Sequence, residues 1–73
     1  KQMRERVYKT MVQRYTSQME DALLKIDMLL TNAGTNSVVV DHSDITGEID
    51  KHLKACAAAS EKLAMLKRFY STN

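Results

Sequence analysis

The sequence contains no proline, no tryptophan and only two glycines among its 73 residues. Proline removes a backbone donor and clashes with the preceding helical turn, and glycine weakens a helix through its backbone freedom. Their scarcity favours long, uninterrupted helices. A chain of this length forms one small domain that hides about 60% of its unfolded surface, so its core alone gives marginal stability.

Cysteine and histidine are nearly as scarce as glycine. Cys56 is the only cysteine, which excludes a disulfide within one chain. His42 and His52 are ten residues apart, and neither has a partner at metal-ligand spacing, so we expect no metal and no cofactor. Because disulfides and metals commonly support small domains, oligomerisation is the support that we expect here.

Long apolar runs and targeting signals are missing as well. No run approaches the roughly 20 apolar residues of a membrane-spanning helix, and no signal pattern opens the chain. A lone cysteine and the absence of a glycosylation sequon indicate an intracellular, cytoplasmic location without membrane contact. Because the chain begins at Lys1, we interpret it as a fragment of a longer protein, in which a third helix could lie.

Apolar residues in the first part of the chain follow a heptad pattern. Their spacings alternate between four and three residues, as at the a and d positions of a coiled coil. This row consists of Tyr8, Val12, Tyr15, Met19, Ala22, Ile26 and Leu29, and it is widened by Met11, Leu23 and Leu30. The pattern predicts a helix over about residues 3–32, ended by Gly34 in the left-handed conformation.

Residues 33–43 read as a loop, because turn formers precede an extended apolar segment, Val38–Val40. These valines either cover the open end of the helices or form an apolar edge for a partner strand. A second helix over about residues 44–71 follows, with Ser43 and Thr46 as alternative N-caps.

The second helix carries its own apolar row, which includes Ile49, Cys56, Leu63 and Tyr70 at intervals of seven residues. Two such helices form an all-α antiparallel hairpin. Leu24, Met28 and Phe69 lie off the narrow seam, which favours pairing of two hairpins into a dimeric four-helix bundle, a homodimer. The residues expected to pack in the core or the dimer are Tyr8, Val12, Tyr15, Met19, Ile26, Leu29, Ile49, Leu53, Cys56, Ala59, Leu63, Leu66 and Tyr70.

Residues 55–60 of this helix are all small, Ala-Cys-Ala-Ala-Ala-Ser. One interpretation is that they lie opposite Met19, Ala22 and Leu23 and let the two backbones approach closely. The alternative is that alanine is simply the best helix former. Both interpretations assign the segment to packing.

The two ends of the predicted hairpin carry opposite net charge. The end with the termini holds eight basic and two acidic residues, or +6, and the loop end holds three basic and seven acidic residues, or −4. The basic end could face an acidic partner, or two hairpins could meet with basic end on acidic end. The helix dipole explains the charges at 44–50 and 67–68, but it disfavours the basic run of residues 1–14 at a helix N-terminus.

The sequence predicts no enzyme. It contains no phosphate-binding loop, nucleophile elbow or metal motif. Cys56 and His52 share a helix face, but the surrounding alanines supply no oxyanion site, so Cys56 is expected to be a small buried hydrophobe. Nucleic-acid binding is also not expected, because the net charge is only +2 and Tyr8 and Tyr15 fall on the seam.

Two segments carry a resemblance to a known family: "RVYKTMVQRYTSQMEDALLKIDMLL" and "VVVDHSDITGEIDKHLKACAAASEKLAMLK". Together they resemble the C-terminal helical region of BAG-family co-chaperones, most of all the divergent "brand-new BAG" branch, in which a helical hairpin pairs into a dimer. The similarity is clearest in "EIDKHLK" and "SEKLAMLK". The alanine stretch departs from the family, which usually has a more charged surface there.

The resemblance implies binding to the ATPase domain of a DnaK-type heat-shock chaperone, with release of ADP and of bound client. A rigid helical face would act by preferring the open nucleotide cleft. The candidate partner-binding residues, chosen for expected exposure, are Arg14, Lys51, Lys54, Lys62 and Lys67. The alternative function is a structural coiled-coil oligomerisation hairpin of a scaffold protein.

Overall fold

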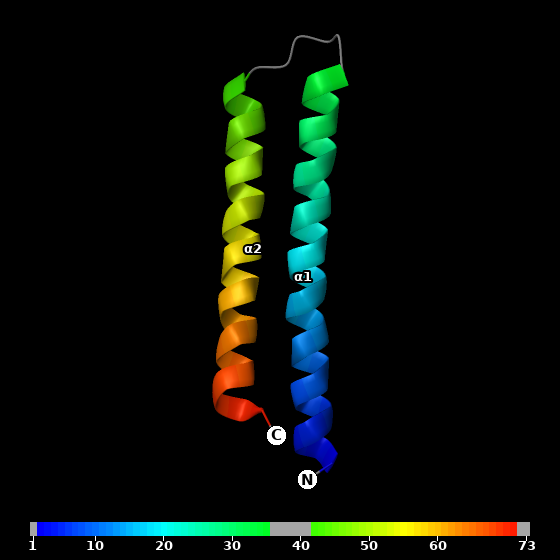
Figure 1. The fold of residues 1–73 in the computed structure, drawn as a ribbon, viewed down its shortest axis with the longest axis vertical. Coiled ribbons are helices and arrows are strands. Elements are labelled where there is room, and N and C mark those ends of the chain that lie inside the picture. The colour runs from blue at the N-terminus through cyan, green and yellow to red at the C-terminus, as the bar shows by residue number, and fades with distance from the viewer. Residues whose placement is uncertain (1, 36–41, 72–73) are drawn as a thin grey trace.

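The chain folds as a hairpin of two long antiparallel helices (Figure 1). The computed structural model describes residues 2–35 and 42–71, with side chains described for 3–31 and 44–71. Helix α1 spans Gln2–Thr35 and helix α2 spans His42–Tyr70, and the rod measures 55 × 15 × 15 Å. The start of α1 and the end of α2 lie at the same end of the rod (Figure 1). The predicted all-α hairpin is therefore confirmed.

Both helices extend further into the connection than the sequence predicted. Helix α1 continues to Thr35 with Gly34 inside it, and no described glycine has a positive φ. A glycine inside a helix costs only about 1 kcal/mol, so it does not oblige the helix to end. Helix α2 begins at His42, before both proposed caps, Ser43 and Thr46. The Val38–Val40 segment lies outside the described residues.

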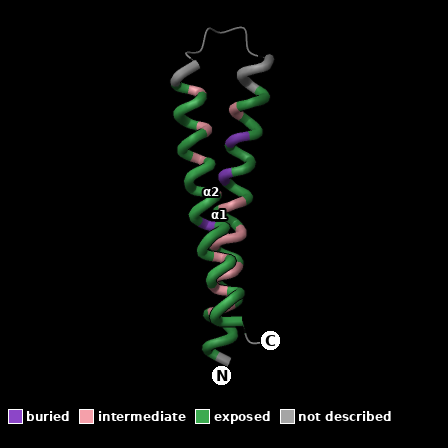
Figure 2. Tube along the Cα trace, turned by 60° about the vertical axis from the view of Figure 1, so that its left-hand side comes forward, coloured by how far each residue is buried: buried purple, intermediate pink, exposed green. Residues whose placement is uncertain are grey.

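The two helices meet along a seam in which both rows keep the alternating spacing of four and three residues. The seam row of α1 is the predicted one, Tyr8 to Leu29, and all seven of its members are buried or partly buried. The seam row of α2 consists of Ile45, Ile49, His52, Cys56, Ala59, Leu63 and Leu66. Figure 2 shows these partly buried positions as a stripe along each helix.

Leu53 and Tyr70 do not pack in the seam of the hairpin, where they remain 50% and 57% exposed, so their expected packing in a dimer stays a prediction. His52 occupies the inner position that Leu53 was expected to take. It lies seven residues after Ile45 and four before Cys56, and therefore continues the heptad row that Leu53 would interrupt. Tyr70 is the last residue of α2, where the helix pair ends.

Small residues supply two of the three buried side chains of the seam. Among the described side chains only Ala22, Ile26 and Ala59 are buried, with exposed fractions of 3%, 8% and 1%. The other small residues of the segment 55–60 are exposed, except Cys56, which is partly buried. Each residue turns a helix by about 100°, so six consecutive side chains cannot all face one neighbour. Among the alanines of this segment, Ala59 alone is therefore buried in the seam, and the close approach of the backbones stays a prediction.

We expect the substitution Gly47→Ala to stabilise the fold. Gly47 is an exposed residue inside α2, and a Cβ atom added there meets no atom within 4 Å. Alanine would restrict the unfolded chain and raise the free energy of unfolding by about 0.8–1.0 kcal/mol. Thermal denaturation followed by circular dichroism should show a melting temperature about 4–8 °C higher. An unchanged or lower melting temperature would contradict this expectation.

Candidate protein-interaction surfaces

Large apolar side chains remain outside the seam along the whole rod. Ten of them are about half exposed or more among the described residues: Met3, Val7, Leu23, Leu24, Met28, Leu30, Leu53, Met65, Phe69 and Tyr70. Solvent-exposed apolar residues are ordinary when scattered singly, but sets that share a helix face mark interaction surfaces. Five of them define two sides of the hairpin, Val7 and Met28 on one and Leu23, Leu30 and Leu53 on the other.

One side is formed by a continuous face of α1, which we call the Met28 face. Its members follow each other at spacings of three and four residues, so they share one side of the helix. They are Arg4, Val7, Met11, Arg14, Gln18, Asp21, Lys25 and Met28. Within this face, Lys25 Nζ lies 3.0 Å from Asp21 Oδ2. The face therefore mixes three apolar residues, Val7, Met11 and Met28, with charged residues of both signs.

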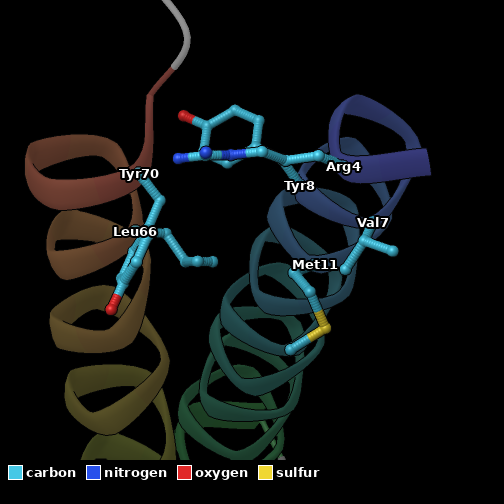
Figure 3. Close-up of a pocket in the computed structure, with 6 residues that line it drawn as sticks. All are labelled: Arg4, Val7, Tyr8, Met11, Leu66 and Tyr70. Atoms are coloured by element: carbon cyan, nitrogen blue, oxygen red, sulfur yellow. The ribbon is translucent and has the colours of Figure 1, made fainter. Parts of the chain in front are cut away.

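A pocket of about 410 Å³ opens beside the Met28 face at the end of the rod that holds both termini (Figure 3). It is lined by Arg4, Val7, Tyr8 and Met11 of α1 and by Leu66 and Tyr70 of α2. The Arg4 side chain extends towards α2 beside the Tyr8 ring, Leu66 extends from α2 towards α1, and the Tyr70 ring lies along α2 (Figure 3). The pocket is therefore apolar with one cation at its rim.

A second pocket, of about 230 Å³, lies beside the other end of the Met28 face. It is lined by Lys25, Met28 and Leu29 of α1 and by Glu48 and His52 of α2. Glu48 Oε1 lies 3.9 Å from His52 Nε2, so the two interact as an ion pair only when the imidazole is protonated. This pocket is lined by groups of both charges, the carboxylate of Glu48 and the ammonium group of Lys25.

The opposite side of the hairpin, which we call the Leu53 side, is organised differently. Leu23, Leu30 and Leu53 are exposed in the half of the rod near the connection. In the other half, Lys9 and Lys67 line a third pocket, of about 330 Å³. Apolar and basic residues are thus separated along this side.

The five cationic residues predicted to bind a partner are all exposed, but the structure does not gather them into one cluster. Lys54 Nζ lies 3.3 Å from Asp50 Oδ2, and Lys62 Nζ lies 5.5 Å from the centroid of the Tyr15 ring. Lys51 and Lys62 are eleven residues apart, about three full turns, and so share one row of α2. Lys67 lies on the Leu53 side instead, and Arg14 belongs to the Met28 face.

Sequence reasoning missed the pocket at the terminal end. Arg4 and Val7 were not singled out as site residues, because neither falls on the seam row. Their spacing to Met11, three and then four residues, was the available signal for a second face of α1. The position of Tyr70 across from this face depends on the register of the two helices, which the sequence pattern alone does not fix.

Reactive groups are few and lie in the seam. Cys56 is a free, partly buried thiol, and His52, one turn earlier, is partly buried too. In the described part of the chain no group of three His, Cys, Asp or Glu residues is placed to hold a metal ion. Neither α1 nor α2, over the residues described, has a stretch long and apolar enough to cross a membrane. The arrangement presents surfaces for binding.

No protein-family model matches the chain, and no curated protein and no solved structure is found to be similar to it. The resemblance to BAG-family co-chaperones therefore stays a prediction from the sequence.

Proposed function

We propose that this chain is a non-catalytic protein-interaction hairpin, which joins protein chains by packing helices against its exposed apolar faces. The observation that supports this is that many more large apolar side chains are exposed on the surface than are buried in the seam. Three described side chains are buried, whereas ten large apolar ones are about half exposed or more. Apolar burial stabilises by about 25 cal/mol per Å², so covering these faces in a four-helix arrangement would add several kcal/mol.

The association of the purified chain with itself tests this proposal. Sedimentation over a range of protein concentrations is expected to show the mass rising from 8.3 kDa towards twice that value. The melting temperature should rise with concentration as well, because association stabilises the folded state by mass action. A chain that stays a folded monomer must instead bind a different protein through these faces for the proposal to stand.

A DnaK-type chaperone ATPase domain is the candidate for such a different protein. The resemblance to BAG-family co-chaperones supports this choice, and so does the exposure of Arg14, Lys51 and Lys62. Cations at an interface steer association and select partners by charge. In this version of the proposal, the hairpin binds the domain with its nucleotide cleft open and promotes release of ADP.

Charge reversal separates a co-chaperone from a scaffold hairpin. We expect the double variant Lys51→Glu/Lys62→Glu to weaken binding to the ATPase domain about tenfold, which corresponds to roughly 1.4 kcal/mol. Titration followed by anisotropy, together with the rate of ADP release, measures this. Lys54→Glu serves as a control, because it reverses an exposed cation of α2 outside the row shared by Lys51 and Lys62. The absence of any complex with the wild-type chain would contradict the co-chaperone role.

A further inference from the structure

Four residues of the Met28 face are spaced seven residues apart and lie on one row of α1. In order they are Val7, Arg14, Asp21 and Met28, all exposed. The row therefore reads apolar, basic, acidic, apolar. Read in the opposite direction, it stays apolar at both ends, while the basic and the acidic positions exchange places. This order is complementary to its own antiparallel copy.

We infer that the Met28 face is a homodimer interface, in which the α1 helices of two copies pack antiparallel about a two-fold axis. In a two-fold interface each contact occurs twice between the same surface patches. An antiparallel copy places Val7 opposite Met28 and Arg14 opposite Asp21, and the symmetry repeats both pairs. A parallel copy would place Arg14 on Arg14 and Asp21 on Asp21, and like charges in contact are destabilising.

The two pockets beside the face support the same arrangement. The pocket with Arg4 at its rim lies next to Val7, and the pocket with Glu48 lies next to Met28. Antiparallel packing brings Met28 of the second copy to the larger, apolar pocket (Figure 3). It also brings Arg4 near the second pocket of the other copy, where Glu48 is the one carboxylate of the lining and Lys25 its ammonium group.

The two ends of the rod carry opposite charge, and this favours the antiparallel orientation at distances longer than those of direct contacts. In the described part of the chain, the terminal end carries an excess of basic residues and the connection end an excess of acidic ones. Antiparallel association sets each basic end against an acidic end, which accelerates encounter and is weakened by salt. The Leu53 side lacks this property, because its own antiparallel copy would place Leu53 and Leu30 against Lys9 and Lys67.

The exposed alanines of α2 leave room for such a neighbour. Ala55 lies seven residues after Glu48, which lines the second pocket, so it is on the same side of the hairpin as the Met28 face. Its side chain is small, and a second α1 helix can therefore approach α2 closely at this level. The inference rests on the proposed function and names the partner of one of its two faces, a second copy of the chain.

Charge exchange across the face is the first test. We expect Arg14→Asp and Asp21→Arg each to raise the dissociation constant of the dimer at least tenfold, measured by sedimentation. The double variant should return to within about threefold of the wild type, because both pairs re-form with reversed sign. Asp27→Arg, an exposed position on another row of α1, is the control, and circular dichroism verifies that each variant is helical.

Cysteine cross-linking is the second test and reports orientation. In a Cys56→Ala background, a chain with Val7→Cys and a chain with Met28→Cys are oxidised separately and as a mixture. Only the mixture should give a covalent dimer, because the two copies of either position are about 32 Å apart in the antiparallel arrangement. Cross-linking of each variant alone would overturn the inference in favour of parallel packing.

The outcomes separate this inference from the function on which it rests. A wild-type dimer that ignores the charge exchange overturns the Met28 face as its interface and leaves the proposed function standing. A monomer that binds the chaperone ATPase domain overturns self-association alone. A monomer that binds neither itself nor that domain overturns both.

Discussion

Replacing Ala59 with leucine is expected to lower the free energy of unfolding by about 1–3 kcal/mol. Ala59 is the most deeply buried residue described, with 1% of its surface exposed, and it lies in the seam between the two helices. The three added carbon atoms have no space in the seam, so the helices must separate or the neighbouring side chains must leave their preferred rotamers. Urea denaturation followed by circular dichroism measures the loss.

The substitution Ala57→Leu is the matched control. Ala57 lies two residues earlier in the same helix and is exposed, so the same side chain is introduced without crowding the seam. Leucine is nearly as good a helix former as alanine, and the control should change stability by less than about 0.5 kcal/mol. Equal losses in both variants would contradict the burial of Ala59 in a crowded seam.

Truncating Ile26 to alanine is expected to cost about 2–5 kcal/mol. Ile26 is the only large side chain among the three buried ones described, with 8% of its surface exposed. Its removal loses apolar burial and leaves a gap that the seam can only partly close. In a domain this small, such a loss approaches the whole stability, so the variant should melt near or below room temperature.

The substitution Leu30→Ala is the control for this truncation, because Leu30 loses a comparable volume from an exposed site on the Leu53 side. We expect a loss below about 0.5 kcal/mol in thermal or urea denaturation of the dilute chain. If Leu30→Ala costs as much as Ile26→Ala, the seam described above does not supply most of the stability.

The fold was predictable because the apolar pattern of α1 is regular over three heptads. Spacing determines which residues share a helix face, and all seven residues of that row lie in the seam. In α2 the same reasoning chose Leu53, because leucine is apolar and histidine is not. His52 lies at the inner position nevertheless, since the row is fixed by the positions of Ile45, Cys56 and Ala59, whatever the polarity of the residue at 52.

The helix ends were less predictable than the rows, for a physical reason. Gly34, Ser43 and Thr46 are residues that often end or begin helices, yet each of them is compatible with a helix interior at a cost of about 1 kcal/mol or less. The structure places all three inside helices. Backbone hydrogen bonds of one further turn outweigh such small preferences, so local signals gave the wrong boundaries.

The candidate surfaces depend on two helices at once, and this limited their prediction. Exposure of the five chosen cations followed from the spacing, but their separation into different sides did not. The pocket between Arg4 and Tyr70 exists only because the first turns of α1 and the last turn of α2 lie side by side. Predicting such pairings requires the register of the two helices. The order of residues along the Met28 face can be read from the sequence, but the pockets beside its two ends can be located only in the structure.

The location of the first turn of α1 and the last turn of α2 would give the proposed dimer a defined length between its two ends. The first turn of α1 and the last turn of α2 lie at one end of a body 55 Å long (Figure 1). In the antiparallel pair proposed above, the two sets of ends point in opposite directions, separated by about the length of the rod. Any domain fused to either end would thus be held at a fixed distance from its counterpart, and the hairpin would set a spacing between the proteins that it joins.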